Sequence, residues 1–170
     1  MAFGRIPRFS PSFSPSEAWI CTKHLLGMGG DDDLVSEFER SFARFIGAKH
    51  GVMVPSARYG LYLILEGLGI GAGDEVIVPG ITYFAIPAMI ELIGAKPVFA
   101  DIGLNTHVID VDEFEAAITE NTKAVIPTHL FGTPCDMDAI NAIAKKHNIE
   151  VIEDCAQSTG ARYKGRRVGA

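Results

Sequence analysis

Short runs of apolar, largely β-branched residues alternate with amphipathic stretches along most of this chain of 170 residues. The runs, which we interpret as strands, span residues 51–54, 75–78, 97–100, 124–127 and 150–153. The stretches between them, which we interpret as helices, span residues 58–68, 82–93, 110–118 and 137–147. Strands that are apolar on both faces and joined by helices are typical of a mostly parallel sheet covered on each side. We therefore predict an α/β fold with right-handed crossovers.

One more helix is expected before the first of these runs. After an acidic triplet at residues 31–33, apolar side chains recur at helical spacing at Leu34, Phe38, Phe42 and Phe45. The triplet lacks the alternating oxygen ligands of a calcium loop. Its negative charge suits the positive end of a helix dipole, so we interpret it as capping rather than as a metal site.

The N-terminal residues show no sign of a targeting helix or a membrane span. Prolines at positions 7, 11 and 15 would interrupt an amphipathic helix. The apolar runs are also too short for a secretory signal or for a bilayer-spanning helix. We expect residues 1–32 to form an N-terminal arm, irregular in its first sixteen residues, and residues 33–170 to form a single domain.

Charge and cysteine usage exclude several classes of function. The formal net charge is −6 and the basic residues are scattered in the sequence, which argues against binding to nucleic acid. Cys21, Cys135 and Cys155 show no CxxC spacing, which disfavours a disulfide framework and a zinc site. We expect a cytoplasmic protein with no bound metal, no nucleic-acid partner and no membrane partner.

Ligands of open parallel sheets bind outside the carboxyl ends of the strands. The first such loop contains Ser56, Ala57 and Arg58 directly before a predicted helix. It could hold a phosphate through backbone N–H groups and the arginine, or it could be a serine cap with a surface arginine. Both interpretations remain open from this loop alone.

Three other residues of these loops are candidates for binding a flat ring. Tyr83 could stack on the ring or pack in the core. Asp154 could keep a ring nitrogen protonated or could cap the next turn, and Gln157 could offer its amide or lie in a solvated turn. His129 is left unassigned, because a single histidine without a located partner is more often a hydrogen-bonded loop residue.

Five segments occur in the order and at the separations found in one known family. They are FERSFARFIGAKHGV, GIGAGDEVIVPGITY, GAKPVFADI, TKAVIPTHLFGTPCDMDAI and VIEDCAQSTGARYKGRRVG. Together they resemble the DegT/DnrJ/EryC1/StrS family of aminotransferases, which depend on pyridoxal 5'-phosphate (PLP). The resemblance implies the large domain of the fold-type I PLP-dependent transferases, with PLP at the strand ends. It also implies that Asp154 contacts the ring nitrogen, Gln157 lies near the ring hydroxyl and Tyr83 stacks on the ring.

The resemblance is weaker at the phosphate loop. The family usually has Ser-Gly-Thr followed by a small residue, whereas this chain has Ser56-Ala57-Arg58-Tyr59. Backbone N–H donation from Ala57, Arg58 and Tyr59 survives that difference, but the threonine hydroxyl does not. The phosphate contacts implied here are therefore those of the backbone and of the Arg58 side chain.

The lysine that forms a Schiff base with PLP in this family belongs to a later segment than the ones quoted. Lys164 belongs to a different family block and is not promoted to that role. We therefore expect residues 33–170 to be an incomplete PLP-binding large domain without the C-terminal small domain. Such a chain would contain no catalytic residue and would bind PLP weakly at best.

The resemblance implies a parent enzyme that transfers an amino group from glutamate to a nucleotide-linked keto-sugar. Such enzymes serve cell-surface polysaccharide or antibiotic-sugar biosynthesis and are typically homodimers. Two alternatives stay open: an inactive remnant that serves as a PLP-binding or assembly module, and a PLP-dependent sugar dehydratase. An ordinary nucleotide-binding domain is a weaker alternative, because no GxGxxG follows the first predicted strand.

Overall fold

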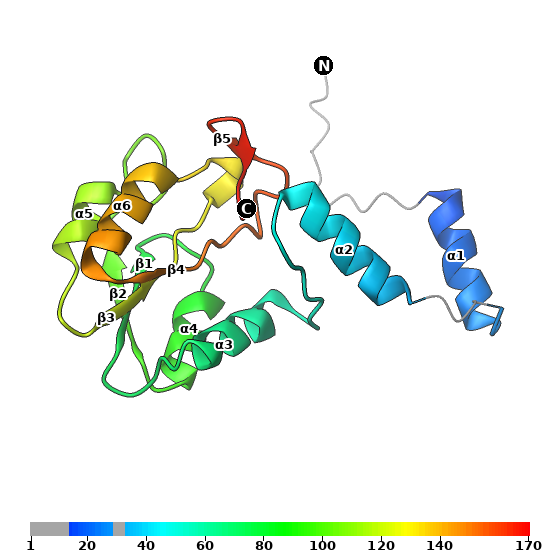
Figure 1. Ribbon diagram of the computed structural model, residues 1–170, viewed down its shortest axis with the longest axis horizontal. Helices are drawn as coiled ribbons and strands as arrows, with labels where there is room; N and C mark the ends of the chain where they lie inside the picture. Colours follow the sequence, from blue (N-terminus) through cyan, green and yellow to red (C-terminus); the bar gives the residue numbers. More distant parts are fainter. Residues whose placement is uncertain (1–13, 29–32) are drawn as a thin grey trace, which may run out of the picture. The chain divides into compact units, whose positions relative to one another are not determined.

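The computed structural model describes residues 14–28 and 33–170 (Figure 1). The chain divides into two compact units, residues 1–37 and residues 38–170. No helix of the described part is long and apolar enough to cross a membrane. The boundary predicted between residues 32 and 33 stays a prediction.

The first unit contains a helix that the sequence analysis did not predict. Helix α1 (Pro15–Leu25) is capped by Ser14, whose side chain accepts a hydrogen bond from the Glu17 N–H. The Ser14 N–H in turn donates to the Glu17 carboxylate at 2.5 Å. Pro15 begins this helix rather than preventing it, because a proline in the first turn has no N–H that needs an acceptor. Residues 1–13, where the irregular arm was predicted, lie outside the described residues.

Helix α2 (Leu34–Ile46) confirms the helical spacing of the apolar residues after position 33. Asp33 caps it, because the Asp33 Oδ1 accepts a hydrogen bond from the Ser36 N–H at 3.2 Å. This supports the capping interpretation for Asp33, whereas Asp31 and Asp32 lie outside the described residues. In the second unit, Ala43 is the buried residue of α2. Phe38, Phe42 and Phe45 of the same helix remain about half exposed.

The centre of the second unit is a parallel sheet of four strands. They are β1 (Glu75–Pro79), β2 (Lys96–Ala100), β3 (Thr122–Val125) and β4 (Glu150–Val151). Their order in the sheet is β2-β1-β3-β4, and each neighbouring pair is parallel. The predicted parallel arrangement is therefore confirmed. A further bridge between Thr128 and Asp154 extends the pairing past the ends of β3 and β4.

Helices cover both faces of this sheet (Figure 1). Helices α3 (Ala57–Gly67) and α4 (Ala85–Leu92) lie on one face, and helices α5 (Val111–Ala116) and α6 (Met137–His147) lie on the other. The core is accordingly in two parts. One contains Leu65, Val76, Val78, Ile90 and Ile126, and the other contains Ile77, Phe114, Val125 and Ile140. Neighbouring residues of β1 alternate between the two parts, as strand geometry requires.

The predicted strand at residues 51–54 is wrong. No strand is present there, and no described strand pairs with this segment. The Met53 N–H instead donates to the Glu39 carboxylate at 2.6 Å. Val52 is 78% exposed and Met53 is 56% exposed, so the apolar run lies on the surface. A β-branched run becomes a strand only where a neighbouring strand accepts its backbone hydrogen bonds.

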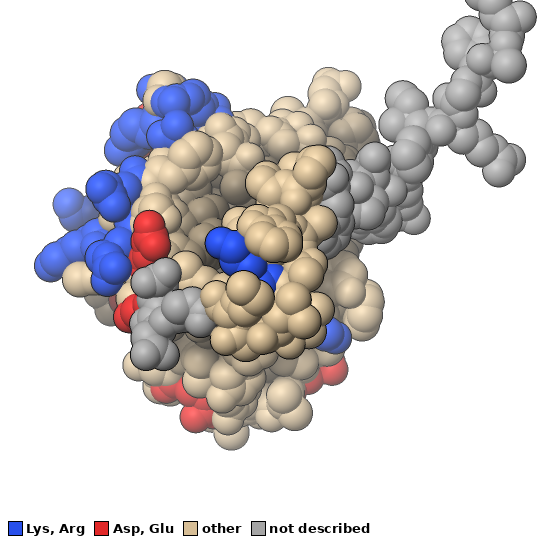
Figure 2. All heavy atoms as spheres, turned by 90° about the vertical axis from the view of Figure 1, so that its right-hand side faces the viewer, with Lys and Arg blue, Asp and Glu red and all other residues tan. Residues whose placement is uncertain are grey.

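The chain ends in a short hairpin of β5 (Arg162–Tyr163) and β6 (Arg166–Arg167). Its basic side chains have local partners. Lys164 Nζ lies 2.6 Å and Arg166 3.5 Å from the Asp138 carboxylate, while the Arg167 guanidinium lies over the Phe45 ring at 4.1 Å. Figure 2 shows Lys and Arg side chains gathered on one side of the face it presents. The linear sequence, in which basic residues are scattered, did not indicate this gathering.

Candidate functional site

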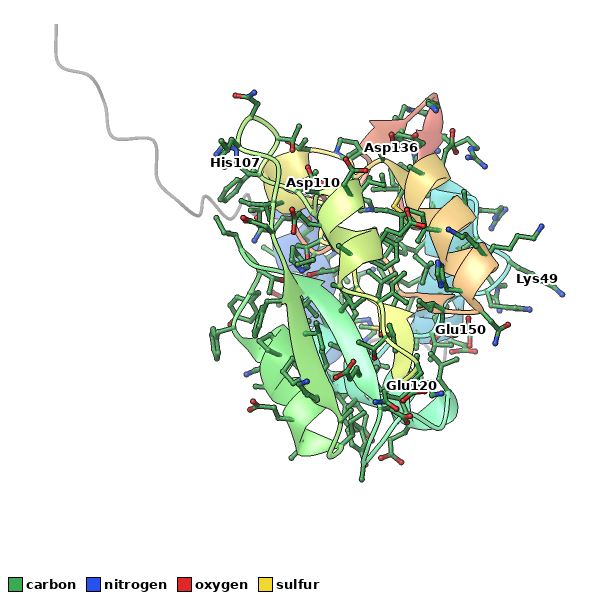
Figure 3. All side chains as sticks on the ribbon, turned by 90° about the vertical axis from the view of Figure 1, so that its left-hand side faces the viewer. Lys49, His107, Asp110, Glu120, Asp136 and Glu150 are labelled. Carbon is green, nitrogen blue, oxygen red and sulfur yellow. The ribbon has the colours of Figure 1, made fainter. Side chains whose placement is uncertain are left out.

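The loops that follow β1, β3 and β4 meet at one edge of the sheet. Figure 3 shows Glu120 and Glu150 at the end where β3 and β4 begin, and Asp110 and Asp136 at the opposite end. At the carboxyl ends, the hydroxyl groups of Thr82 and Thr128 are hydrogen-bonded at 3.0 Å, and Thr128 forms a bridge with Asp154. Thr82, the residue before Tyr83, is therefore linked to Asp154 through Thr128. Neither threonine was singled out from the sequence.

Asp154 is fixed at this edge by three hydrogen bonds. Its N–H donates to the Pro127 carbonyl at 2.9 Å, and its carbonyl accepts from the His129 N–H at 3.0 Å. The side-chain Oδ1 accepts from the Ala156 N–H at 3.0 Å, which closes a local turn. The other oxygen, Oδ2, has no partner among the described residues. Asp154 thus caps a turn, as one prediction had it, and still has an oxygen available for a ligand.

Gln157 is held by the turn that follows β3. Its Oε1 accepts a hydrogen bond from the Phe131 N–H at 3.2 Å. Phe131 belongs to the short 3₁₀ turn η1 (Leu130–Gly132) and has a left-handed φ of 54°. Because the oxygen of the Gln157 amide is occupied, its NH₂ group is the part that remains available to donate to a ligand.

Tyr83 is not a core residue. It is 51% exposed, and its ring contacts the Phe84 ring at a centroid distance of 4.6 Å. Of the two interpretations drawn from the sequence, core packing is therefore wrong. An exposed aromatic ring beside the carboxyl end of β1 can stack on a flat ligand.

The Ser56 loop is a helix cap. Ser56 precedes α3, and its Oγ accepts from the Tyr59 N–H at 3.3 Å. Within the described residues, the Ala57 and Arg58 N–H groups have no hydrogen-bond acceptor, and Arg58 has no ion pair. The Tyr59 N–H already donates to the Ser56 hydroxyl, so the N–H groups of Ala57 and Arg58 are more readily available to a ligand. Their proposed contact with a phosphate remains a prediction.

His129, left unassigned from the sequence, is fully buried and hydrogen-bonded through both ring nitrogens. The Cys135 N–H donates to Nδ1 at 3.0 Å, so Nδ1 carries a lone pair. The hydrogen of the neutral ring must then be on Nε2, which donates to the Glu153 Oε2 at 2.8 Å. Glu153 was present in the predicted last strand, but nothing in the sequence indicated that it would meet His129.

Glu153 remains ionised in this environment. Burial raises the pKa of its carboxyl group, but hydrogen bonds from His129 and from the Gly169 N–H outweigh burial and lower the pKa below the ordinary value of 4.5. The Gly169 N–H lies 2.9 Å from the same Oε2 atom that accepts from His129. One carboxylate oxygen therefore joins the turn after β3 to Gly169, the second residue after the hairpin.

Ligand atoms of His129, Glu153 and Cys155 lie within 4.8 Å of one another, but the cluster does not suit a metal. The His129 Nε2 carries a hydrogen, so it has no lone pair for a cation. Burial raises the pKa of the Cys155 thiol to about 12, so the sulfur is not a thiolate near neutral pH. The cluster is better explained as a hydrogen-bonded pair, His129 and Glu153, beside a protonated and partly buried thiol.

Lys164 has the wrong environment for a nucleophilic amine. Its ion pair with Asp138 raises the pKa of its ammonium group, and the group also lies over the Tyr163 ring at 5.0 Å. A lysine that attacks a carbonyl needs a lowered pKa. This environment therefore does not favour Lys164 as a Schiff-base lysine.

A separate pocket of about 420 Å³ lies between the hairpin and the loop before α5. It is lined by Asp110, Asp136 and Tyr163, among others, and none of the predicted cofactor contacts lines it. The Tyr163 hydroxyl donates to the Asp136 Oδ1 at 2.6 Å, and this hydrogen bond lowers the pKa of Asp136. The acidic side chains here anchor the hairpin and cap helices.

Comparison with known proteins gives the chain a family. Residues 23–170 match the model of the DegT/DnrJ/EryC1/StrS aminotransferase family. A dTDP-3-amino-3,6-dideoxy-alpha-D-galactopyranose transaminase from Aneurinibacillus thermoaerophilus is 48% identical over 143 residues, which are 84% of this chain and 39% of the relative. A UDP-2-acetamido-2-deoxy-3-oxo-D-glucuronate aminotransferase from Pseudomonas aeruginosa is 50% identical over 133 residues, which are 78% of this chain and 37% of the relative.

The fold agrees with these matches. The X-ray structure of an aminotransferase from Psychrobacter cryohalolentis superposes with a TM-score of 0.88 at 42% identity and covers 95% of this chain. The chain covers 42% of that structure and 39% and 37% of the two relatives, so it spans about two fifths of their length. The predicted large-domain fold is confirmed, and the chain belongs to the DegT/DnrJ/EryC1/StrS aminotransferase family.

Proposed function

We propose that this chain is the PLP-binding part of an aminotransferase, with the ring nitrogen of PLP beside Asp154. The observation that carries the proposal is the geometry of the Asp154 carboxylate. Its Oδ1 is engaged by the Ala156 N–H, so the side chain is oriented, while its Oδ2 remains without a partner among the described residues. A carboxylate placed in this way keeps a pyridine nitrogen protonated by close ion pairing.

The residues around Asp154 fit the other parts of the cofactor. Tyr83 offers an exposed ring beside the same sheet edge, and Gln157 offers an amide NH₂. Ala57 and Arg58 offer two backbone N–H groups at the start of a helix of eleven residues, with Tyr59 next to them. A helix N-terminus with an adjacent arginine suits a phosphate.

The reaction class follows from the relatives. When bound, PLP supplies an electron sink for a carbanion next to nitrogen. We propose that the protein carrying this sequence transfers an amino group from glutamate to the ketone of a nucleotide-linked sugar, giving 2-oxoglutarate and an amino-sugar. The two relatives, which are named for a dTDP-linked and a UDP-linked sugar, support a nucleotide sugar as the substrate. We also propose a homodimer and a cytoplasmic location, as is typical of the family.

Titration of the purified chain with PLP tests the cofactor assignment. Asp154→Asn removes the charge and keeps the shape, so we expect PLP affinity to fall by about tenfold or more. Asp101→Asn is a matched control, because Asp101 also follows a strand and its Oδ1 accepts from the next N–H at 2.8 Å. Equal affinity in the wild type and the Asp154→Asn variant would refute the assignment.

The reaction requires a separate assay. With glutamate and dTDP- or UDP-linked keto-sugars, the protein carrying this sequence is expected to release 2-oxoglutarate and aminate the sugar. Loss of a sugar hydroxyl without gain of nitrogen would indicate the dehydratase alternative. PLP binding without turnover of any of these sugars would favour a binding or assembly module.

A further inference from the structure

We propose that His129 and Glu153 form a positioning pair that holds Asp154 and Gln157 in the orientation needed to bind a pyridine-type cofactor. This inference rests on the proposed function, since the residues that it positions are the proposed PLP contacts. Neither His129 nor Glu153 is placed against the cofactor. The pair is assigned a role through its neighbours.

Glu153 immediately precedes Asp154, and its Oε2 accepts from the His129 Nε2–H and from the Gly169 N–H at 2.8 and 2.9 Å. One oxygen thus connects three segments: the turn after β3, the strand end that carries Asp154, and the residues after β6. Removing the donor on His129 leaves the carboxylate with a single partner at a mostly buried position.

The two hydrogen bonds of the His129 ring fix its tautomer. The Cys135 N–H can only donate, so Nδ1 must accept, and Nε2 must carry the hydrogen that Glu153 receives. The ring is fully buried, so water does not replace either partner. A neutral imidazole is therefore fixed between a backbone N–H and a carboxylate, in the manner of the hydrogen-bonded partners that orient functional groups in other sites.

The backbone of the turn that carries His129 bonds to both proposed ligand contacts. The backbone N–H of His129 donates to the Asp154 carbonyl at 3.0 Å. Two residues later, the Phe131 N–H donates to the Gln157 Oε1 at 3.2 Å. A shift of the His129 side chain would therefore reach both Asp154 and Gln157 through bonds of the same short turn.

Gly169 approaches segment 153–155 closely. A Cβ atom built at this position would lie 3.1 Å from the Cys155 Sγ, and the φ angle of 82° is in the left-handed region. Glycine therefore allows the backbone to approach segment 153–155 closely enough to donate to Glu153. The approach of this segment completes the environment of the Glu153 oxygen.

Two substitutions of His129 separate the two hydrogen bonds of the ring. His129→Gln places an amide near the Nε2 position and can still donate to Glu153, whereas His129→Asn places an oxygen near the Nδ1 position and can still accept from Cys135. The proposal gives the Glu153 bond the positioning role. We expect PLP affinity to fall by about tenfold in His129→Asn and by less than about threefold in His129→Gln.

Amide exchange of the chain without PLP provides the second measurement. The Ala156 N–H reports on the Asp154 Oδ1, and the Phe131 N–H reports on the Gln157 Oε1. We expect both amides to exchange about tenfold faster in His129→Asn than in the wild type, and to be nearly unchanged in His129→Gln. The induced circular dichroism of bound PLP should weaken in His129→Asn as well, since it reports the orientation of the ring.

The outcomes distinguish this inference from the proposed function. If the Ala156 and Phe131 amides exchange at the wild-type rate in His129→Asn, the positioning role is overturned, whether or not the affinity for PLP changes. Failure of Asp154→Asn to affect PLP binding would overturn the proposed function, while altered exchange would still support positioning. If the thermal stability of the two His129 variants falls equally and PLP affinity follows it, the pair is merely structural. Should His129→Asn not fold, Glu153→Gln is the further variant: its neutral amide accepts a weaker hydrogen bond than the carboxylate, so faster exchange of the Ala156 and Phe131 amides is expected, and unchanged exchange would overturn the positioning role.

Discussion

The two parts of the proposed cofactor site are held in different ways. The Asp154 side lies where paired parallel strands end, and its backbone N–H and carbonyl groups both have partners across the sheet edge. The Ser56 side follows segment 51–54, whose apolar residues are exposed and whose Met53 N–H is bonded to a carboxylate rather than to a strand. A sheet edge thus fixes one half of the site, whereas the other half follows an exposed segment with which no described strand pairs.

Truncation of a buried side chain beside the Asp154 half should have the largest effect. Ile126, 1% exposed and directly after β3, belongs to the core between the sheet and α3. We expect Ile126→Ala to lower the free energy of unfolding by about 2–5 kcal/mol, because it leaves a cavity. Val52→Ala, at a 78% exposed residue of the other half, should change it by less than about 0.5 kcal/mol. Urea denaturation measures both.

A large destabilisation by Val52→Ala would contradict the difference between the Asp154 half and the Ser56 half of the site. It would mean that segment 51–54 is covered in the native protein, for example by a second copy of the chain. Sedimentation of the wild type and the variant at matched concentrations would then separate association from folding.

The Ser56 half has one tight backbone contact, and Gly51→Ala tests it. A Cβ atom at Gly51 would lie 2.8 Å from the Glu39 carbonyl oxygen, which is backbone and cannot rotate away. We expect a loss of about 1–3 kcal/mol in the free energy of unfolding. Gly67→Ala is the control, since nothing lies within 4 Å of its added Cβ atom, and it should stabilise α3 by about 0.5–1 kcal/mol. Equal effects of both substitutions would show that segment 51–54 is not held against α2.

Two substitutions of Ser56, the N-cap of α3, separate its effect on stability from its effect on anion binding. Ser56→Ala removes the acceptor of the Tyr59 N–H and should cost about 1 kcal/mol. Ser56→Asp keeps a capping oxygen, so its thermal stability should match the wild type, but its negative charge should weaken binding of the PLP phosphate. Unchanged PLP affinity in Ser56→Asp would contradict the proposed phosphate contacts of Ala57 and Arg58.

The same contrast explains what the sequence could predict. The runs predicted at 75–78 and 97–100 lie within observed strands, and the run at 124–127 overlaps β3, because each is apolar in sequence and finds a parallel neighbour. The run at 51–54 has the same composition, and composition does not say whether a partner strand exists. Asp154 could be singled out because the end of a strand is visible in the sequence.

The support around Asp154 could not be predicted in the same way. The His129–Glu153 bond joins residues 24 positions apart, and the Thr82–Thr128 bond joins residues 46 positions apart. Such pairs depend on strand order and register, which periodicity does not give. Helix α1 was missed for a local reason, because the Ser14 and Glu17 capping box outweighs the expectation that Pro15 would prevent a helix.

The smallest expected effect concerns the ionisation of Glu153 and appears only on acidification. Its pKa is lowered in the folded chain because the hydrogen bonds from His129 and Gly169 outweigh burial, so the net shift is a difference between opposing effects. A carboxyl group with a lowered folded pKa stabilises the protein above its unfolded pKa, and this contribution is lost as the pH falls through the folded pKa. Wild-type stability should therefore decline more steeply below the ordinary glutamate pKa of 4.5 than that of Glu153→Gln, which has no proton to bind. Unfolding free energies measured by urea at a series of pH values would show the two curves converging as the pH falls, whereas parallel curves would mean that Glu153 titrates as a free carboxyl and is not held by His129.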